Sequence, residues 1–567
     1  MEPAFFKGPT PPPIPTKDVL SWMFDEPRCE DDRKVLIDAT DDSRYITFGH
    51  ARNTIRRVIK GLKAAGMEKG DCVLIHAFND IYYPLLGLSI IGVGGVFAGS
   101  NPSYTPRELI HHIATSQARI VISEPEMLVN VRAAIGELPE GSVKAVYVFN
   151  LREGQSVPAG EKSWEELLDA GGKEGEDWVR FDDKETAENT VACRLFSSGT
   201  SGLPKGVEIT HYGLVAQHEL AHETEDSLKG QIWTLKLPMF HVANVPLVFT
   251  SFFRMPWTGY VLRRFDMETW LSTVEKYKAT HTSLPPIIAI GIVKSPLTDR
   301  YDISSLRTVV SAAWALNPDI QNMLVRKIKP VKGREEDEPR VTQLWGMTEA
   351  TCIVTKFNHP EVDGTGSVGR LIPGIEAKIV DDEGADISDY NVTGEICLRG
   401  PTITKCYFGN PEATRTSWDQ GGFYHTGDVG YCDRETKKWY LIDRKKELIK
   451  VRGFQVAPVE IEGILLGHPQ ILDAAVVGVV LEEYGSELPR AYIVLRPGST
   501  ADKKALDEDG VKEFVKGQVA TYKRLEGGVV FVDAIPKNAT GKVLKRVLRE
   551  RAEREVGSVG RVGGGSC

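Results

Sequence analysis

The sequence predicts an α/β fold with a largely parallel sheet, followed by a small β unit and a separate α+β domain. Helical and strand patterns alternate in the N-terminal part, which is typical of a parallel sheet. Residues 376–399 instead carry two strand patterns joined by an acidic, turn-rich stretch. After Asp443 the patterns become short and mixed, which indicates a further domain.

The N-terminal elements follow from local periodicity. Apolar residues recur at helical spacing over residues 47–66, and a short apolar run at 72–75 predicts a buried strand. The uncharged stretch 81–100 has about the length of a membrane span, but its proline and glycines favour a buried helix followed by a buried strand. Further apolar runs at 119–123 and 143–149 predict two more strands.

The C-terminal elements are short, with expected segments at 459–466, 474–480, 490–496, 511–518 and 529–532.

The chain has 567 residues, too many for one hydrophobic core. We expect a flexible N-terminus at 1–17, a large domain at 18–443 with its β unit at about 370–443, a C-terminal domain at 444–550 and a flexible tail at 551–567.

Composition excludes some classes of protein and partner. The net charge of −9 argues against a general nucleic-acid or anionic-membrane binder, which would need a basic surface. Eight scattered cysteines without a Cys-x-x-Cys pair indicate reduced thiols and a cytoplasmic location. The N-terminus shows no secretory signal, and the last three residues do not match the peroxisomal Ser-Lys-Leu signal.

The stretch 195–207 has the composition of a loop that wraps a polyphosphate. Glycines allow backbone N–H groups to approach an anion, hydroxyls donate hydrogen bonds, and a lysine supplies charge. It is not a Walker loop, because Gly-Lys-Ser/Thr is absent. The candidate phosphate-binding residues are Ser197, Ser198, Gly199, Thr200, Ser201, Gly202 and Lys205.

Residues 198–206 resemble the phosphate loop of the adenylate-forming superfamily, which includes acyl-CoA synthetases and 4-coumarate–CoA ligases. Five further stretches resemble its other motifs in the family's order: 343–349, 424–428, 443–446, 450–458 and 536–542. The resemblance covers roughly residues 18–548. It implies a large N-terminal domain of two α/β subdomains plus a small β-barrel-like unit, with a smaller mobile α+β C-terminal domain. It also implies a stand-alone acyl- or aryl-CoA ligase that uses ATP, Mg²⁺ and coenzyme A.

The resemblance assigns nucleotide-binding roles. Trp345 would stack on adenine, Thr348 would lie beside the α-phosphate, and Glu349 would ligate Mg²⁺. Asp428 would accept hydrogen bonds from the ribose hydroxyls and Arg444 would donate to the ribose.

Other roles concern the two half-reactions. Lys542 would hold the carboxylate and the α-phosphate together while the acyl-adenylate forms, because a cation between two anions lowers the barrier. The C-terminal domain would then turn about a hinge at Arg444–Lys446. Lys450 and Gln455 would lie near the reaction centre when the thiol attacks.

The acid-binding residues differ from the coumarate-ligase pattern. His241 would gate or orient the acid, and the position two residues later, often aromatic in that branch, is Ala243. Ala312, Trp314 and Leu344 occupy segments that would line the same pocket, with added bulk at Trp314 and Leu344. A reshaped pocket disfavours a hydroxycinnamate and leaves medium-chain, branched and other aryl acids as candidates.

Several alternatives stay open. A separate carrier protein is an alternative acceptor to coenzyme A, since coenzyme A binding leaves no compact motif. A non-catalytic descendant is disfavoured because the expected charged residues are all present. His218-Glu219-x-x-His222 fits a zinc-protease pattern, but no third ligand is evident and we expect a surface helix there. Gly364–Gly369 fits a dinucleotide fingerprint but lacks the strand and helix around it, so we expect a loop.

Overall fold

The computed structural model describes residues 5–197, 204–223, 230–312, 316–328, 339–451, 454–481, 486–497, 506–538 and 541–559. The chain divides into two compact units. The larger unit contains residues 1–378, 397–425 and 437–439, and the second contains 379–396, 426–436 and 440–567. The chain passes from the larger unit to the second unit for the last time between Trp439 and Tyr440, close to the expected boundary between residues 443 and 444.

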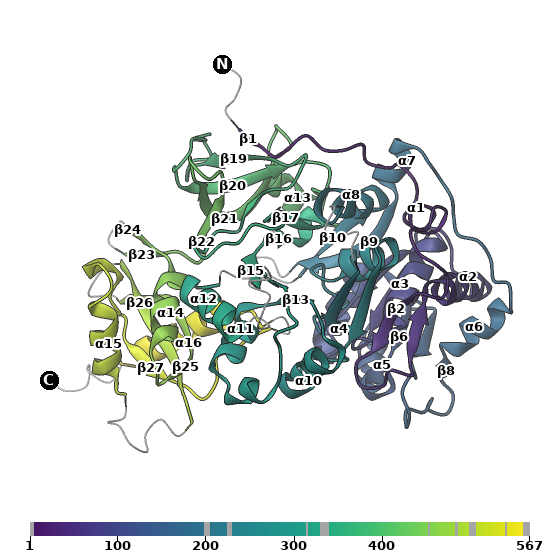
Figure 1. Ribbon diagram of the computed structural model, residues 1–567, viewed down its shortest axis with the longest axis horizontal. Coiled ribbons are helices and arrows are strands. Elements are labelled where there is room, and N and C mark those ends of the chain that lie inside the picture. Colours follow the sequence, from purple (N-terminus) through teal and green to yellow (C-terminus); the bar gives the residue numbers. More distant parts are fainter. Residues whose placement is uncertain are drawn as a thin grey trace. The chain divides into compact units, whose positions relative to one another are not determined.

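The larger unit contains two mostly parallel sheets, as the α/β prediction required (Figure 1). The first has the order β10-β9-β5-β4-β6-β7-β8, with only the β9–β10 pair antiparallel. Its strands, in that order, are Lys205–Thr210, Val191–Ser197, Val96–Gly99, Cys72–His76, Ala118–Ser123, Ala145–Val148 and Lys162–Ser163.

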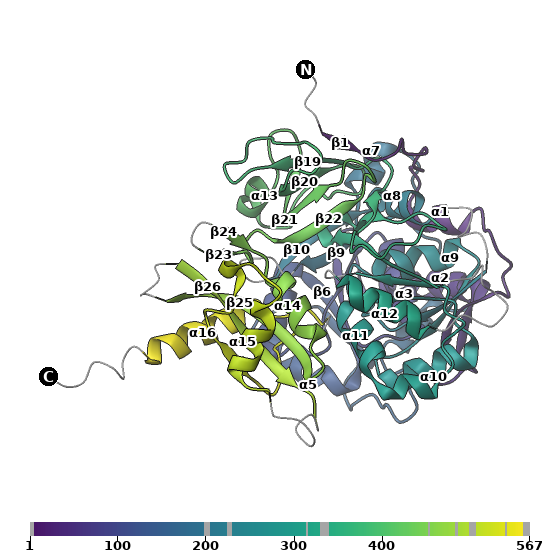
Figure 2. The ribbon, with the colours of Figure 1, turned by 60° about the vertical axis from the view of Figure 1, so that its left-hand side comes forward.

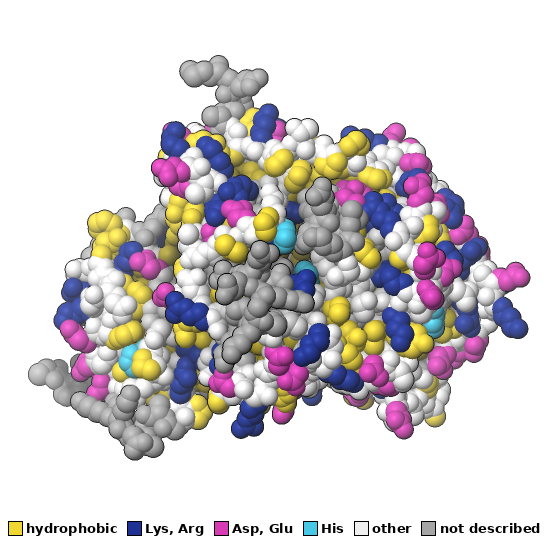
Figure 3. All heavy atoms as spheres, viewed as in Figure 1, with side chains coloured by type: hydrophobic (Ala, Val, Ile, Leu, Met, Phe, Trp, Pro, Cys, Tyr) yellow, Lys and Arg dark blue, Asp and Glu magenta, His cyan; other side chains and the backbone are white. Residues whose placement is uncertain are grey.

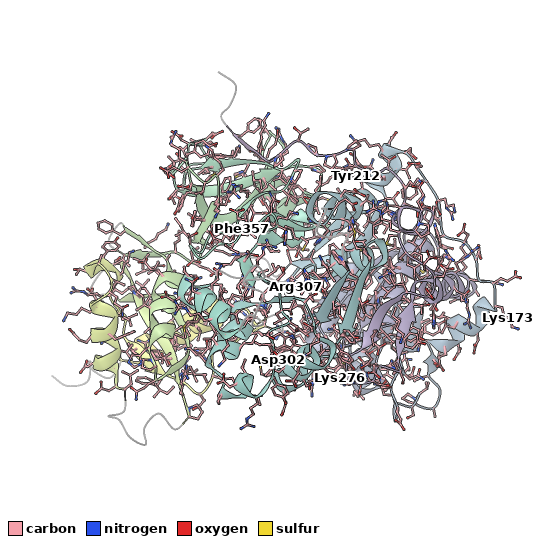
Figure 4. All side chains as sticks on the ribbon, in the orientation of Figure 1. Lys173, Tyr212, Lys276, Asp302, Arg307 and Phe357 are labelled. Carbon is pink, nitrogen blue, oxygen red and sulfur yellow. The ribbon has the colours of Figure 1, made fainter. Side chains whose placement is uncertain are left out.

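The second sheet has the order β15-β14-β13-β11-β12-β2-β3, and only the β2–β3 pair is antiparallel. Its strands are Arg340–Gln343, Thr308–Ser311, His281–Leu284, Gln231–Leu235, Trp257–Val261, Lys34–Asp38 and Tyr45–Thr47. Arg307, labelled in Figure 4, precedes β14 and lies at the amino-terminal edge of this sheet, so the carboxyl ends of its parallel strands meet at the opposite edge.

Helices cover both sheets, and their ends carry recognisable caps. Thr105 and Glu108 form a capping box at α4, and Thr210 caps α8 through the backbone N–H of Gly213 at 3.1 Å. Figure 2 shows α11 and α12 side by side, and α12 packs against β15 of the second sheet. The helices are α1 Val19–Phe24, α2 Phe48–Ala64, α3 Tyr83–Gly92, α4 Pro106–Ser116, α5 Leu128–Gly136, α6 Glu165–Gly171, α7 Lys184–Asn189, α8 His211–Ala221, α9 Phe252–Arg254, α10 Met267–Tyr277, α11 Pro286–Lys294, α12 Pro318–Lys327 and α13 Pro411–Ser417.

Shorter elements complete this unit. A π-helical turn, η3 Leu247–Ser251, precedes α9. Single 3-10 turns are η1 Pro125–Met127, η4 Pro296–Arg300 and η5 Thr348–Ala350. A small three-stranded sheet joins β16 Trp345–Met347, β17 Cys352–Lys356 and β18 Arg370–Leu371.

The expected small β unit is a five-stranded sheet with the order β1-β19-β20-β21-β22. Its strands are Phe6–Lys7, Glu376–Val380, Gly394–Arg399, Tyr424–Cys432 and Trp439–Arg444, and β19, β20, β21 and β22 each contain residues of both units. The N-terminus was expected to be flexible. Instead, Phe6 and Lys7 pair antiparallel with Ala377 and Glu376, because an unpaired sheet edge offers backbone partners.

The second unit carries the C-terminal α+β elements. They are β23 Ile449–Val451, β24 Phe454–Val456, α14 Pro458–Gly467, β25 Ile471–Leu481, β26 Ser486–Leu495, α15 Glu508–Lys516, η6 Thr521–Lys523, β27 Val529–Phe531 and α16 Lys545–Val559. The tail expected from residue 551 begins within α16, where Ala552 is fully buried and Arg551 pairs with Glu555. Packing of the apolar side of α16 therefore extends the helix beyond the local sequence signal.

No helix among the described residues is long and apolar enough to cross a membrane. The stretch 81–100 forms buried α3 and β5, as predicted. Seven cysteines lie in the described part of the chain and none is in a disulfide. Figure 3 shows Lys and Arg interspersed with Asp and Glu over the visible face. This mixture agrees with the net charge of −9.

Helix α2 approaches α6 through glycine. A Cβ at Gly61 would lie 2.0 Å from the Leu167 carbonyl oxygen, whereas one at Gly136 in α5 would meet nothing within 4 Å. We therefore expect Gly61→Ala to destabilise the larger unit by about 1–3 kcal/mol through overpacking. Gly136→Ala is the matched control and should be neutral or slightly stabilising. Urea unfolding of both variants checks this, and equal midpoints would contradict the close α2–α6 contact.

Candidate active site

Two predicted acid-binding residues lie at the carboxyl edge of the second sheet. Ala312 follows β14, and Leu344 follows β15. The backbone N–H of Leu344 donates to the Ser311 carbonyl at 3.0 Å, and that of Ala312 donates to the Leu284 carbonyl at 3.4 Å. Parallel pairing thus brings these residues together from distant parts of the sequence. Trp314, predicted for the same site, lies outside the described residues.

His241 lies in the loop that follows β11, and two asparagines hold this loop. Asn79 donates to the Leu237 carbonyl at 2.9 Å and accepts from the Met239 backbone at 2.9 Å, while Asn244 donates to Leu237 at 2.8 Å. The backbone N–H of Ala243 donates to His241 Nδ1 at 3.1 Å.

The His241 ring is consequently a neutral donor. Burial lowers the pKa of His241 to about 4, so the imidazole is uncharged at neutral pH. Because Nδ1 accepts a hydrogen bond, the single ring proton belongs on Nε2. An imidazole N–H at this position can orient a bound acid without adding charge.

Glu349 and Lys205 converge on one tyrosine that the motifs did not indicate. Glu349 is buried in η5, and the Tyr407 phenol donates to its Oε1 at 2.8 Å. The Lys205 ammonium lies 4.7 Å from the centroid of the Tyr407 ring. Burial, followed by the nearby charge of Glu349, raises the pKa of Tyr407 well above its usual value, so the phenol remains a donor. The structure thus links two motifs that are far apart in the sequence.

The adenine and phosphate residues are placed less completely. Trp345 and Thr348 are both buried, and the Trp345 backbone donates to Thr355 at 3.2 Å. Ser197 ends β9 with a buried hydroxyl that has no hydrogen-bond partner among the described residues. The remaining predicted loop residues, Ser198, Gly199, Thr200, Ser201 and Gly202, lie outside the described part of the chain.

Three predicted nucleotide-binding residues come together in the second unit. Arg444 Nε lies 3.0 Å from Asp428 Oδ1. Burial lowers the pKa of Lys542, and the charge of Arg444 acts in the same direction, while Glu447 and Asp428 oppose it. A carboxylate and two cations in one place can hold a ribose and an adjacent phosphate.

The loop that carries Lys542 is anchored on both sides. Lys537 pairs with Asp473 at 2.5 Å on one side of the loop. On the other side, the buried Lys545 ammonium lies 3.3 Å from Glu462 and 3.6 Å from Glu447. Within the loop, the Lys542 backbone N–H donates to Asn538 Oδ1 at 2.9 Å. These contacts fix the backbone from which Lys542 projects.

The residues predicted for the second half-reaction lie on a hairpin. Lys450 in β23 is exposed and pairs in register with Gln455 in β24, whose side chain lies outside the description. The backbone N–H of Lys450 donates to the Glu487 carboxylate at 2.8 Å. Lys446, the predicted hinge, is exposed in the turn after β22, and its carbonyl accepts from Arg549 at 2.9 Å.

The zinc-protease pattern is not a metal site in this structure. His218 Nδ1 lies 2.8 Å from the Ser251 hydroxyl, and its Nε2 lies 3.2 Å from Glu223. Glu219 accepts from the Trp22 indole at 2.9 Å. Both nitrogens of His218 are therefore already engaged. The prediction of a surface helix was wrong, because α8 is mostly buried between other elements. Gly364–Gly369 is a loop, as predicted.

A cavity of about 270 Å³ is lined by residues of α7, β10 and the segment 400–406. Tyr212, labelled in Figure 4, is part of its lining. Thr404 also belongs to this wall and donates to the Glu349 carbonyl through its backbone N–H at 2.8 Å and its hydroxyl at 3.1 Å. None of the predicted site residues lines this cavity.

Sequence reasoning missed a buried lysine at the carboxyl edge. Lys236 follows β11 and is 3% exposed. Its ammonium donates to the Thr282 hydroxyl and the Ser283 carbonyl, both at 2.5 Å. Burial alone lowers the pKa of Lys236 to about 7. The available signal was a lysine directly after an apolar strand, and it is weak because such residues are usually exposed.

The family models match most of the chain. Residues 24–408 match the AMP-binding enzyme model, and residues 460–542 match the model of the AMP-binding enzyme C-terminal domain. The chain is 46% identical over 558 residues to a phenylacetyl-CoA ligase from Aspergillus niger, covering 97% of this chain and 100% of that protein. It is 47% identical over 551 residues to an acyl-CoA ligase from Aspergillus niger, covering 96% and 100%.

A solved structure confirms the fold. The crystal structure of ATP-bound MatB from Rhodopseudomonas palustris matches with a TM-score of 0.81 at 25% identity, covering 95% of this chain and 99% of that chain.

Lys236 gives a stability prediction with a defined pH dependence. Burial lowers its pKa from 10.5 to about 7. The cost of burying the charged lysine lowers the free energy of unfolding. This cost is absent above pH 10.5, grows as the pH falls towards 7, and is fully present below pH 7. We expect Lys236→Met to stabilise the protein more at about pH 6.5 than at about pH 9.5, by roughly 3 kcal/mol.

Chemical denaturation at both pH values measures this difference. Lys60→Met, which changes an exposed lysine on α2, is the matched control and should show no such dependence. An equal effect of Lys236→Met at both pH values would contradict the description of Lys236 as a buried cation whose ammonium bonds, among the described residues, to a hydroxyl and a carbonyl.

Proposed function

Because the chain belongs to the AMP-binding enzyme family and is an AMP-forming acid–CoA ligase, we propose that its two units supply distinct parts of one two-step reaction. Acid, ATP and coenzyme A give acyl-CoA, AMP and pyrophosphate. In the first step a carboxylate oxygen attacks the α-phosphorus, and the bond to the pyrophosphate oxygen breaks. In the second, the thiol sulfur attacks the acyl carbon, the bond to AMP breaks, and the thiol proton passes to water.

Adenylation brings a carboxylate to a polyphosphate, so it needs cations at the point of attack. Lys542 is proposed to supply one, with Asp428 and Arg444 holding the ribose. The single observation that most supports this is the grouping of these three residues, in which the charges of both Arg444 and Asp428 act on Lys542. Lys205 and the glycine- and hydroxyl-rich loop before it would hold the outer phosphates. Trp345 would stack on the adenine and Thr348 would lie beside the α-phosphate.

The surroundings of Glu349 fit a magnesium ion. Glu349 is buried, and among the described residues its side-chain partner is the neutral Tyr407 phenol, so its charge suits a cation. Its carboxylate oxygens are ligands that magnesium prefers, and phosphate oxygens complete such a site. When bound, the ion neutralises negative charge on the polyphosphate. Glu349 would hold it, and Tyr407 would keep the carboxylate in place.

The acid is proposed to bind at the carboxyl edge of the second sheet, beside Ala312, Leu344 and His241. The small side chains of Ala243 and Ala312 and the neutral His241 ring suit an apolar acid. The identity to a phenylacetyl-CoA ligase favours an aryl acid, with an arylacetic acid as the first candidate and medium-chain acids as the second.

The thiol step is proposed to follow a rotation of the C-terminal domain, residues 444–550, about the hinge at Arg444–Lys446. Lys450 and Gln455 would then approach the acyl-adenylate. Coenzyme A is the proposed acceptor, and a separate carrier protein is the alternative. The seven cysteines in the described part of the chain form no disulfide, which supports the proposal of a cytoplasmic location.

Pyrophosphate release with MgATP tests the function and names the acid. The panel contains arylacetic, benzoic and hydroxycinnamic acids and aliphatic acids from butanoic to octadecanoic, each with and without coenzyme A. Release with an aryl acid and formation of its thioester are the expected results. Adenylate that accumulates without thioester would point to a carrier protein, and no release with any acid would contradict the proposal.

Replacement of Lys542 should separate chemistry from binding. We expect Lys542→Ala to slow acid-dependent pyrophosphate release by about 10²–10³-fold, because one preorganised donor to the developing charge is lost. ATP binding measured by calorimetry should persist. Arg546→Ala, an exposed position paired with Glu550 in the same helix, is the control. Wild-type release by Lys542→Ala would show that the role of Lys542 is misassigned.

Lys450 should matter mainly in the second step. In Lys450→Ala and Gln455→Ala we expect thioester formation from preformed adenylate to fall by about 10–100-fold, with a smaller effect on adenylate formation. Single-turnover mass spectrometry measures both steps. Lys512→Ala, a change at a partly exposed position in α15, is the control. An equal loss in both steps would undermine the proposed division.

A further inference from the structure

Tyr407 lies outside every motif that predicted the site, yet it contacts two of the predicted residues. Its phenol donates to Glu349 Oε1 at 2.8 Å, and the Lys205 ammonium lies 4.7 Å from its ring centroid. The side chain is 5% exposed. A tyrosine in this position therefore meets a buried carboxylate at its edge and a cation at its face.

Backbone contacts fix the segment that carries Tyr407. Tyr407 forms an antiparallel bridge with Val207 in β10, and the Phe408 backbone N–H donates to the Gly206 carbonyl at 2.8 Å. Three residues earlier, Thr404 makes two hydrogen bonds to the Glu349 carbonyl. The segment 404–408 thus connects the end of the phosphate loop to η5, independently of the Tyr407 side chain.

The hydrogen bond also has a directional consequence. The Tyr407 phenol occupies Oε1 of Glu349, and the Tyr424 oxygen lies 3.2 Å from the phenol oxygen on the other side. The Tyr407 hydrogen bond takes one lone pair of Oε1, which favours Oε2 as the oxygen that Glu349 directs towards a cation. The Lys205 ammonium lies over the ring face, and no ion pair between Lys205 and Glu349 occurs among the described contacts.

We propose that Tyr407 is a positioning residue for the first half-reaction: its hydroxyl orients Glu349 for monodentate magnesium binding, and its ring holds Lys205 beside the phosphates. This inference rests on the proposed roles of Glu349 and Lys205. Outer partners of a metal ligand typically change metal affinity or activity by about 10–100-fold when removed.

If Tyr407 had only a packing role, its variants would affect activity in a different way. Tyr407 packs with Val207 and Tyr424 in a small apolar cluster, and Trp418 lies against its ring with centroids 5.4 Å apart. If packing were its only function, phenylalanine would replace it fully. Tyr407→Phe keeps the ring and removes only the donor, and Tyr407→Leu removes the ring as well.

The test compares Tyr407→Phe and Tyr407→Leu with Glu349→Gln and with Tyr212→Phe, a half-buried tyrosine on α8. One readout is the Mg²⁺ concentration for half-maximal pyrophosphate release. The second is the dissociation constant for Mn²⁺ in the presence of a non-hydrolysable ATP analogue, measured by electron paramagnetic resonance.

For Tyr407→Phe we expect the half-maximal Mg²⁺ concentration and the Mn²⁺ dissociation constant to rise by about 10–100-fold, with an unchanged KM for the acid. Tyr407→Leu should additionally raise the KM for ATP, and Tyr212→Phe should match the wild type.

Failure of the inference can be told apart from failure of its premise. If Glu349→Gln weakens metal binding and Tyr407→Phe does not, the positioning role of Tyr407 is overturned and the role of Glu349 stands. If Glu349→Gln also leaves metal binding unchanged, the metal role of Glu349 is wrong and the inference fails with it. Thermal unfolding of each variant confirms that the comparison is between folded proteins.

Discussion

The constraint on which the site depends is charge. A carboxylate must approach a polyphosphate, so the protein has to keep cations available where burial disfavours them and acidic neighbours would neutralise them. Lys205 meets an aromatic face, and burial and Arg444 lower the pKa of Lys542. Glu349 accepts from the Tyr407 phenol, and Lys205 lies over the ring of the same residue. Tyr407 thus contacts a carboxylate and a cation that form no ion pair with each other among the described residues.

Elements with a local signal were predictable from the sequence. The stripe at 47–66 forms α2, the run at 72–75 forms β4, and 81–100 forms α3 and β5. Elements stabilised by distant partners were not. Strand β10 was read as the end of the phosphate loop, because its antiparallel pairing with β9 leaves no pattern in six residues. For the same reason β1, which pairs with β19, was taken for a flexible terminus.

The site divides in the same way. Motifs identified Glu349, Asp428, Arg444 and Lys542, and the structure groups the last three within one unit. Tyr407 could not be found, because its contact with Glu349 spans 58 residues and a single tyrosine carries no motif. Lys236 was missed because its burial depends on strands that pair with β11, and no local pattern reports that pairing.

Lys542 and Lys545 show that environment rather than residue type assigns a role. They lie in one short segment of the second unit, yet their pKa values shift in opposite directions. Burial alone would lower the pKa of Lys545, but the carboxylates of Glu462, Asp443 and Glu447 outweigh burial and raise it. The ammonium of Lys545 therefore stays charged and anchors the loop through its ion pair with Glu462. For Lys542, burial and Arg444 prevail over its acidic neighbours. A lysine whose charge is disfavoured by burial gains from an incoming anion, which suits the role proposed for Lys542 in adenylation.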